Sequence, residues 1–168
     1  MTAADPRADR PAPVEMVFRT AIADDAAATA PAVSQWVIFR CSGEQYGVPL
    51  SVVSEIVPPR PFTRLPGADS AVCGLVGIRG QVVTVVDLGT LLHGHAAASV
   101  PDFRLLLLES GGRTIGAAVD DVVMVAPARA VPGGDSDNRT PGVTGIGRTD
   151  DGTFVTLDPA HLLERLLR

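Results

Sequence analysis

The sequence predicts an all-β fold of two small β-barrels packed together, with a short helix at the C-terminus. Short runs of β-branched and other apolar residues alternate with glycine-rich turns at intervals of roughly 8 to 12 residues, a spacing typical of barrels and sandwiches. This order of strand, glycine turn and strand occurs twice along the chain. Only the last residues have clear helical character.

The chain resembles a diverged internal duplication. A shift of the sequence against itself by about 70 residues pairs apolar residues with apolar residues and glycines with glycines. Asp87 falls on Asp158, and each aspartate is followed by a Leu-Leu pair. We interpret the chain as two repeats near residues 36–92 and 105–163. We expect two barrels that each close their own edges, with a cleft between the halves where a partner or ligand could bind.

Residues 1–34 are expected to form a flexible arm, followed by one folded region at 35–168. The arm is rich in Ala, Pro, Asp and Thr and has too little apolar bulk to offset the entropy lost on ordering. Its apolar residues form a small island that could dock on the domain or on a partner, or could stay unpaired. The island consists of Val14, Met16, Val17, Phe18 and Ile22.

From Gln35 onward the pattern changes to strands. The segment WVIFRCSGEQYGVPL is typical of a hairpin whose turn lies around residues 42–44. SVVSEIVPP follows as a short turn or strand. It ends at Pro58, Pro59 and Pro61, which cannot lie inside a sheet because proline lacks the N–H that a strand donates.

The stretch from Leu65 to Leu92 is expected to present residues at its surface turns rather than to form a catalytic site, because its few polar residues lie at turns. Its glycines permit sharp turns and close backbone approach, and the run VVTVV is strand-like. Arg79 lies between turn residues, just before a strand. We therefore expect its guanidinium to point into water.

The second half repeats this organisation. DFRLLLLESGGRTIGAAVDDVVMVA predicts another hairpin with Gly111 and Gly112 at its turn, and PGGDSDNRTP is a loop by composition. A helix is predicted over Pro159–Arg168, with Asp158 as N-cap and leucines on one face. A shorter helix is expected around Leu91 and Leu92.

Composition excludes several function classes. The net charge is -5 and all 14 basic side chains are scattered arginines, which argues against nucleic acid as a partner. No apolar run approaches the roughly 18 to 20 residues needed to cross a bilayer, so membrane insertion is not expected. The N-terminus has acids and prolines where a secretory signal needs a basic start and an apolar core. Two cysteines suit a reducing compartment, and we expect the protein in the cytoplasm.

Signals for an enzyme or a metal protein are weak. His93 and His95 form an H-x-H pair, but zinc sites generally need three or four ligands and no further ligand clusters nearby. Asp87 and Asp158 recur at equivalent repeat positions, which indicates turn or cap duties rather than paired acid–base catalysis. No catalytic residues, metal site or cofactor are therefore predicted. A small metal-binding or enzymatic β-barrel stays a weaker alternative.

The chain from about Gln35 to Leu167 resembles the CheW family of chemotaxis coupling proteins, which link chemoreceptors to the histidine kinase CheA. The resemblance rests on FRCSGEQYGVPL, SEIV, RLPGADSAVCGLVGIRGQVVTVVDL and IGAAVDDV. It implies two five-stranded SH3-like barrels. The chain departs from the common Asn-Leu-Arg-Gly turn, which is Gly77-Ile78-Arg79-Gly80 here, and has Thr84 where proline is usual. These departures suggest weaker binding or a divergent set of receptors.

The resemblance implies a non-catalytic adaptor at receptor arrays on the inner face of the membrane. Its partners would be the regulatory domain of a CheA-type histidine kinase and the helical hairpin tip of a chemoreceptor's cytoplasmic part, held in a groove between the barrels. The alternative is a CheW-like scaffold of a non-chemotactic chemosensory pathway, in pilus motility or development. The residues alone do not separate these two.

Site residues follow from the same resemblance. The receptor-side positions are Val53, Glu55, Gly74 and Arg79. For the kinase side, strand edges of the first barrel are nominated at Tyr46, Val48 and Leu50. Simpler interpretations stay open for each receptor-side position. Val53 could be a core residue and Glu55 a solvated carboxylate. Gly74 could be a structural glycine, and Arg79 could form an ordinary surface ion pair.

Overall fold

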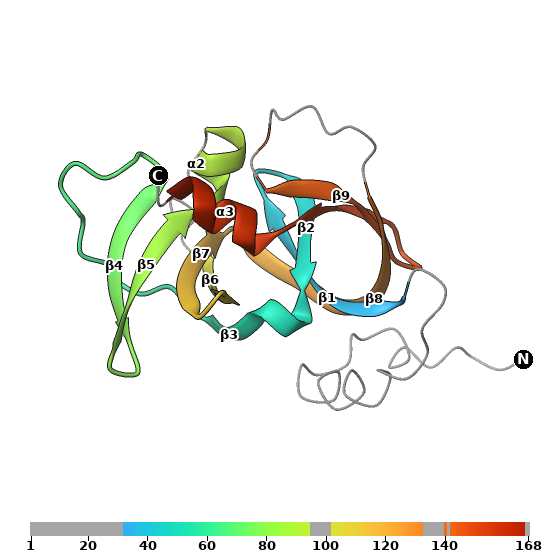
Figure 1. The fold of residues 1–168 in the computed structure, drawn as a ribbon, viewed down its shortest axis with the longest axis horizontal. Coiled ribbons are helices and arrows are strands. Elements are labelled where there is room, and N and C mark those ends of the chain that lie inside the picture. The colour runs from blue at the N-terminus through green and yellow to red at the C-terminus, as the bar shows by residue number, and fades with distance from the viewer. Residues whose placement is uncertain (1–31, 95–101, 133–139, 141, 167–168) are drawn as a thin grey trace, which may run out of the picture.

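The described strands form a closed five-stranded barrel and a second five-stranded sheet that lie beside one another (Figure 1). The computed structural model describes residues 32–94, 102–132, 140 and 142–166. The all-β prediction is confirmed. The apolar island of the predicted arm, His95 and most of the loop 132–141 lie outside the described residues.

The closed barrel has the strand order β1-β2-β10-β9-β8, and β8 closes the ring by pairing with β1. Its strands are β1 (Ser34–Cys41), β2 (Glu44–Pro49), β8 (Asp121–Pro132), β9 (Val143–Arg148) and β10 (Thr153–Leu157). The second sheet has the order β3-β6-β7-β5-β4. Its strands are β3 (Val53–Val57), β4 (Val72–Ile78), β5 (Gln81–Asp87), β6 (Arg104–Ser110) and β7 (Arg113–Val119).

Each sheet takes strands from both halves of the chain. β1 and β2 join β8, β9 and β10, whereas β6 and β7 join β3, β4 and β5. Two parallel pairings, β2 with β10 and β5 with β7, link the halves. The expectation of one barrel for each half is therefore wrong, because the first hairpin of each half pairs with the later strands of the other. The duplication of the sequence itself stays a prediction.

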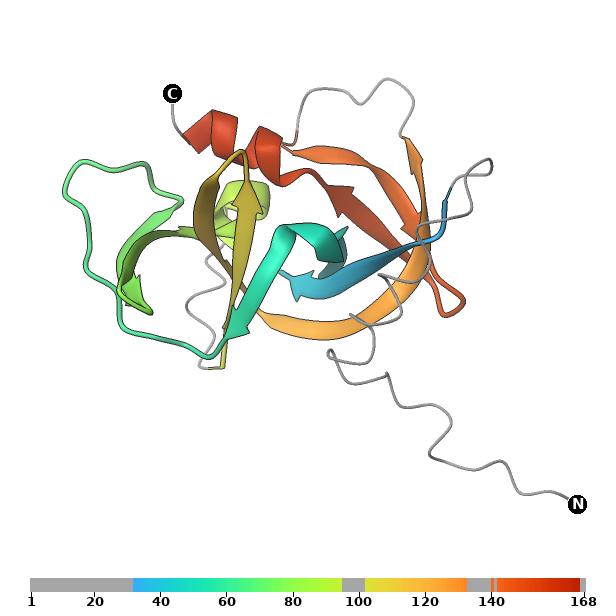
Figure 2. The same ribbon diagram turned by 60° about the horizontal axis from the view of Figure 1, so that its bottom comes forward.

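The second sheet does not close as the barrel does. Between its end strands β3 and β4, the described residues form no ladder. The chain between these strands carries Pro58, Pro59 and Pro61, and instead Thr63 forms an isolated bridge with Leu75 of β4. The expected closure of both barrels is thus met only by the first one. Figure 2 shows the sheet curling without closing.

The predicted turns and helices are present. Ser42 and Gly43 have φ values of 51° and 85° at the β1–β2 turn, and Gly111 and Gly112 form the β6–β7 turn. The described part of the chain contains three short helices: η1 (Leu50–Val52), α2 (Leu88–His93) and α3 (Pro159–Leu166). None of the described helices is long and apolar enough to span a membrane.

Both α-helices begin at the aspartates that the repeat pattern pairs. The Asp87 carboxylate accepts a hydrogen bond from the Thr90 amide at 2.9 Å, and Asp158 accepts one from the Ala160 amide at 2.8 Å. Such bonds satisfy amides that the first helical turn leaves without a partner. The predicted cap duties of both aspartates are confirmed.

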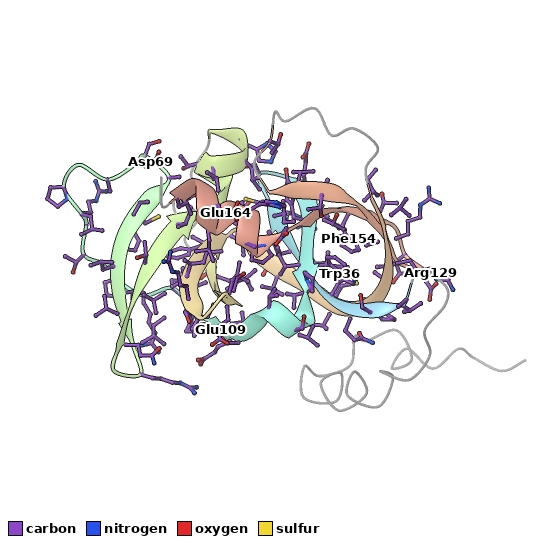
Figure 3. All side chains as sticks on the ribbon, viewed as in Figure 1. Trp36, Asp69, Glu109, Arg129, Phe154 and Glu164 are labelled. Carbon is purple, nitrogen blue, oxygen red and sulfur yellow. The ribbon has the colours of Figure 1, made fainter. Side chains whose placement is uncertain are left out.

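The two faces of β1 divide the core into two parts, because successive side chains on a strand point to opposite faces. Trp36 and Ile38 point into the closed barrel with Phe154 (Figure 3). Val37 and Phe39 point outward into a cluster that also holds leucines of β6 and α3. This outward cluster contains side chains of both sheets, so it is the shared core that packs the two sheets against each other.

Candidate functional site

The β4–β5 turn displays Arg79. This residue and Gly80 have φ values of 49° and 77°, between the closing pair Ile78 and Gln81. Positive φ at both central residues is the conformation that a two-residue type I′ hairpin requires. The Arg79 side chain is 79% exposed, so its guanidinium lies at the surface as the sequence predicts.

Arg79 forms an ion pair with Glu55. The Arg79 Nη2 to Glu55 Oε1 distance is 2.9 Å, and the Glu55 side chain is 30% exposed. Glu55 belongs to β3 and Arg79 to the turn after β4, so the pair joins the two opposite ends of the second sheet. An exposed pair contributes only about 0–1 kcal/mol to stability. It places the Arg79 guanidinium beside the Glu55 carboxylate on the exposed surface.

Val53 and Gly74 are not part of this exposed surface. Val53 is 8% exposed and belongs to the shared core. A Cβ on Gly74 would lie 2.2 Å from the Thr63 carbonyl oxygen, and the φ of Gly74 is 151°. Glycine is needed here because the chain before β4 approaches the strand closely. Of the four nominated receptor residues, the structure thus brings two together at the surface and buries the other two.

Tyr46, Val48 and Leu50 do not lie at a strand edge. Their side chains are 3%, 0% and 6% exposed. β2 pairs with β1 on one side and with β10 on the other. The edge placement is wrong for Tyr46, because β10, distant in sequence, pairs with β2 at Tyr46 and Gly47. Val48 pairs with β1 and is fully buried, and Leu50 lies in η1 rather than in a strand.

Tyr46 connects the barrel to helix α2. Its hydroxyl lies 2.5 Å from His93 Nε2 and donates to Glu44 Oε2 at 3.0 Å. Burial, followed by the hydrogen bond and negative charge of Glu44, raises the pKa of Tyr46. The phenol therefore stays neutral and anchors the end of α2. His93, one member of the H-x-H pair, thus has a structural partner.

The described residues show no group of three or more His, Cys, Asp or Glu side chains that could hold a metal ion. His161 is exposed and lies 3.2 Å from Asp158. Burial is the main cause that raises the pKa of Cys41 to about 12 and that of Cys73 to about 11. Both thiols are therefore protonated and weakly nucleophilic at neutral pH.

Sequence reasoning missed the exposed apolar side chains of the sheets. Val82 is 73% exposed on β5, directly opposite Gly77 of β4. Val131 and Ile146 are 51% and 52% exposed on β8 and β9. The continuous apolar run QVVTVVD gives no alternation from which the exposure of Val82 could be predicted. In VTGIGR, by contrast, glycines alternate with larger residues, and this alternation was a signal that Ile146 faces away from the barrel interior.

The model of the CheW-like domain matches residues 35–167. The chain belongs to the CheW family. The matched residues include strands of both the closed barrel and the second sheet, together with Glu55 and Arg79. The resemblance deduced from the motifs is confirmed.

Relatives and a solved structure agree with this membership. The chain is 26% identical to the chemotaxis protein CheW of Helicobacter pylori over 79% of this chain and 83% of that protein. For CheW of Bacillus subtilis the identity is 26%, and the match spans only about half of each protein, 51% and 54%. Protein FrzA of Myxococcus xanthus is 32% identical over 58% of this chain and 61% of FrzA.

The crystal structure of the scaffolding protein TtCheW from Thermoanaerobacter tengcongensis has a TM-score of 0.67 to this chain. The sequences are 26% identical, and the match covers 76% of this chain and 90% of TtCheW. The protein thus has the sequence and the fold of the CheW family.

Proposed function

We propose that this CheW-like protein is a non-catalytic adaptor that couples chemoreceptors to a CheA-type histidine kinase. The observation that carries the proposal is the Arg79–Glu55 pair at an exposed two-residue turn. A cation fixed at the rim of a surface can orient a helical partner and select it by charge. Family membership and the scaffold relative support the adaptor class.

In this proposal the receptor's helical hairpin contacts Arg79 and Glu55, while Val53 and Gly74 hold β3 and β4 in place. The kinase regulatory domain binds the outside of the barrels. Tyr46, Val48 and Leu50 then act by holding β2 in place rather than by touching the kinase. The protein would act in the cytoplasm, at receptor arrays on the inner face of the membrane.

A second candidate is a CheW-like scaffold of a different chemosensory pathway. The observation in its favour is that FrzA, a relative not named CheW, shares 32% identity with this chain. Both candidates use the same surfaces and differ in the kinase and receptor that are bound.

The first test is calorimetric titration of the full chain with the regulatory domain of a CheA-type kinase from the same organism. We expect micromolar or tighter binding, about -8 kcal/mol or stronger. Binding only to the kinase of another chemosensory pathway would favour the second candidate. No binding to any such kinase would contradict both.

The second test distinguishes the proposed receptor-binding surface around Arg79 from other exposed parts of the protein. Arg79→Asp should weaken binding of a receptor hairpin fragment at least about tenfold, because reversal of a rim charge adds repulsion without opening a cavity. Arg113→Asp is the matched control, since Arg113 is also an exposed arginine beside a glycine turn. Binding of the kinase domain should survive both changes. An equal loss of receptor binding in both variants would refute the assignment of Arg79.

A further inference from the structure

Among the residues that the structure describes, three of the five strongly exposed large apolar side chains lie on the closed barrel. Val33 immediately precedes β1, Val131 is on β8 and Ile146 is on β9. Val131 and Ile146 are directly opposite each other across the β8–β9 pairing. Single exposed apolar residues are ordinary, whereas neighbouring ones form a continuous apolar surface that a partner segment can cover.

Two arginines extend this surface. Arg129 and Arg148 form the next outward pair along β8 and β9, two residues from Val131 and Ile146 on each strand. Residues two apart on a strand share a face, so all four side chains point outward together. Like charges placed directly opposite each other are unfavourable. Neither guanidinium has an ion-pair or hydrogen-bond partner within the part of the chain that the structure describes.

We call Val33, Arg129, Val131, Ile146 and Arg148 the basic-apolar patch. It lies on a protein of net charge -5, and its chemistry fits a segment that is both acidic and apolar. Figure 3 shows Arg129 at the end of the closed barrel that is remote from the second sheet. The patch is therefore separate from the Arg79–Glu55 surface.

The arm leaves the barrel at the border of this patch. Pairing of β1 with β8 ends at Ser34 opposite Ala128, whereas β8 continues to Pro132. The antiparallel course directs the chain before Ser34 toward residues 129–132 of β8. Val131 is three residues beyond Ala128, a distance of about 10 Å along an extended strand.

The arm carries complementary chemistry. Val14, Val17, Phe18 and Ile22 have the spacing of one face of a helix. Asp24 and Asp25 follow this apolar group after the single residue Ala23. The steps from Asp25 to Val33 can span up to about 27 Å, more than the patch requires.

We propose that residues 14–25 of the arm dock on the basic-apolar patch of the same molecule. The apolar side chains cover Val131 and Ile146, and Asp24 and Asp25 lie beside Arg129 and Arg148. A short tether places the segment at an effective concentration of about a millimolar, so a weak contact is sufficient. The arm then shields this end of the barrel from other partners, whichever kinase or receptor the protein serves.

The test uses the full chain and its backbone amide signals in nuclear magnetic resonance. Asp24→Arg/Asp25→Arg reverses the acidic pair, and Asp5→Arg/Asp9→Arg makes the same charge change elsewhere in the arm. We expect the first variant to shift the signals of Val131, Ile146 and Arg148 and to speed amide exchange at Val131 about twofold. The control variant should leave both unchanged.

Charge exchange supplies the second arm of the test. Arg129→Asp/Arg148→Asp combined with Asp24→Arg/Asp25→Arg should restore the protection of Val131, whereas Arg129→Asp/Arg148→Asp alone should lose it. The proposal would be overturned if the amide signals of the basic-apolar patch did not change when the charges of Asp24 and Asp25 are reversed. It would also be overturned if the control variant changed these signals equally. Protection that rises with protein concentration would also overturn it, because a second copy would then cover the patch.

Discussion

Phe154 fills the closed barrel because two strands have glycine beside its ring. A Cβ on Gly47 would lie 2.4 Å from the ring, and one on Gly147 would lie 2.1 Å from it. Phe154 is 3% exposed, and its ring centroid lies 5.5 Å from that of Trp36. The ring cannot move aside without disturbing the tryptophan, so both glycines are fixed by packing rather than by turn geometry.

Gly147→Ala should therefore destabilise the protein by about 1–3 kcal/mol through overpacking. Gly77→Ala is the matched control: it also lies in a strand, and a Cβ there meets nothing within 4 Å. Urea unfolding followed by Trp36 fluorescence measures both changes. Equal stability of the two variants would mean that the barrel interior adapts to the added methyl group.

The thiols give a pH-dependent prediction. Burial raises the pKa of Cys73 from 9.0 to about 11. At pH 8 its thiolate fraction, and so its alkylation rate, should be about 100-fold below that of a cysteine with the ordinary pKa, rising about tenfold per pH unit until about pH 11. Mass spectrometry after iodoacetamide treatment tests this. A rate that levels off below pH 10 would contradict the assigned burial.

The same shift predicts the direction in which alkali affects stability. The unfolded chain releases its thiol protons near pH 9.0, whereas folded Cys73 and Cys41 keep theirs to about pH 11 and about 12. Above pH 9 the folded state thus binds more protons than the unfolded state. The free energy of unfolding therefore falls as the pH rises through this range, and is unaffected by these groups below it.

Single residues differ in how far the sequence could predict them. The exposure of Arg79 was predictable, because an arginine side chain at a tight glycine turn projects away from the sheet and into solvent. The burial of Tyr46 was not, because a hairpin sequence shows which residues alternate but not which distant strand covers them. Contact between Glu55 and Arg79 likewise needs the curl of the second sheet, which no local pattern encodes.

Short elements with strong local signals were predicted well. The caps of α2 and α3 follow from an aspartate placed before a leucine pair, and the hairpin turns follow from glycines that accept positive φ. The two caps differ in environment: Asp87 is 2% exposed, whereas the Asp158 side chain is 39% exposed.

That difference predicts unequal costs for the same substitution. Asp158→Ala should cost about 1 kcal/mol, the usual value for an exposed cap. Asp87→Ala should cost about 2–3 kcal/mol, since Asp87 is itself buried and its loss leaves the part-buried Thr90 amide without its acceptor where water has little access. Asp151→Ala, at an exposed loop position, should stay within about 0.5 kcal/mol of the parent. Thermal unfolding of the three variants provides the comparison. A larger cost at Asp158 than at Asp87 would contradict the ranking.

At the scale of the whole molecule, the exchange of hairpins between the halves has the largest consequence. Hydrophobic alternation predicts which face of a strand is buried but does not identify the neighbouring strand, so two five-stranded β units could be predicted but not which strands each contains or that only one closes. Every described sheet needs both halves of the chain. The core that lies between the sheets also draws on both halves, from Phe39 to Leu162.

A chain divided within residues 95–101 should therefore give two halves that do not fold alone. The first half would retain β1 and β2 without the three strands that complete the barrel, and the second half would retain those three without β1 and β2. Each half would expose unpaired strand edges and lack most of the shared core. Mixed in equal amounts, the halves should recover the emission of Trp36 and one cooperative unfolding transition whose midpoint rises with concentration. The uncut chain, with a midpoint independent of concentration, is the control. Cooperative unfolding of either half alone would show that a barrel can form from contiguous strands, contrary to the exchanged topology.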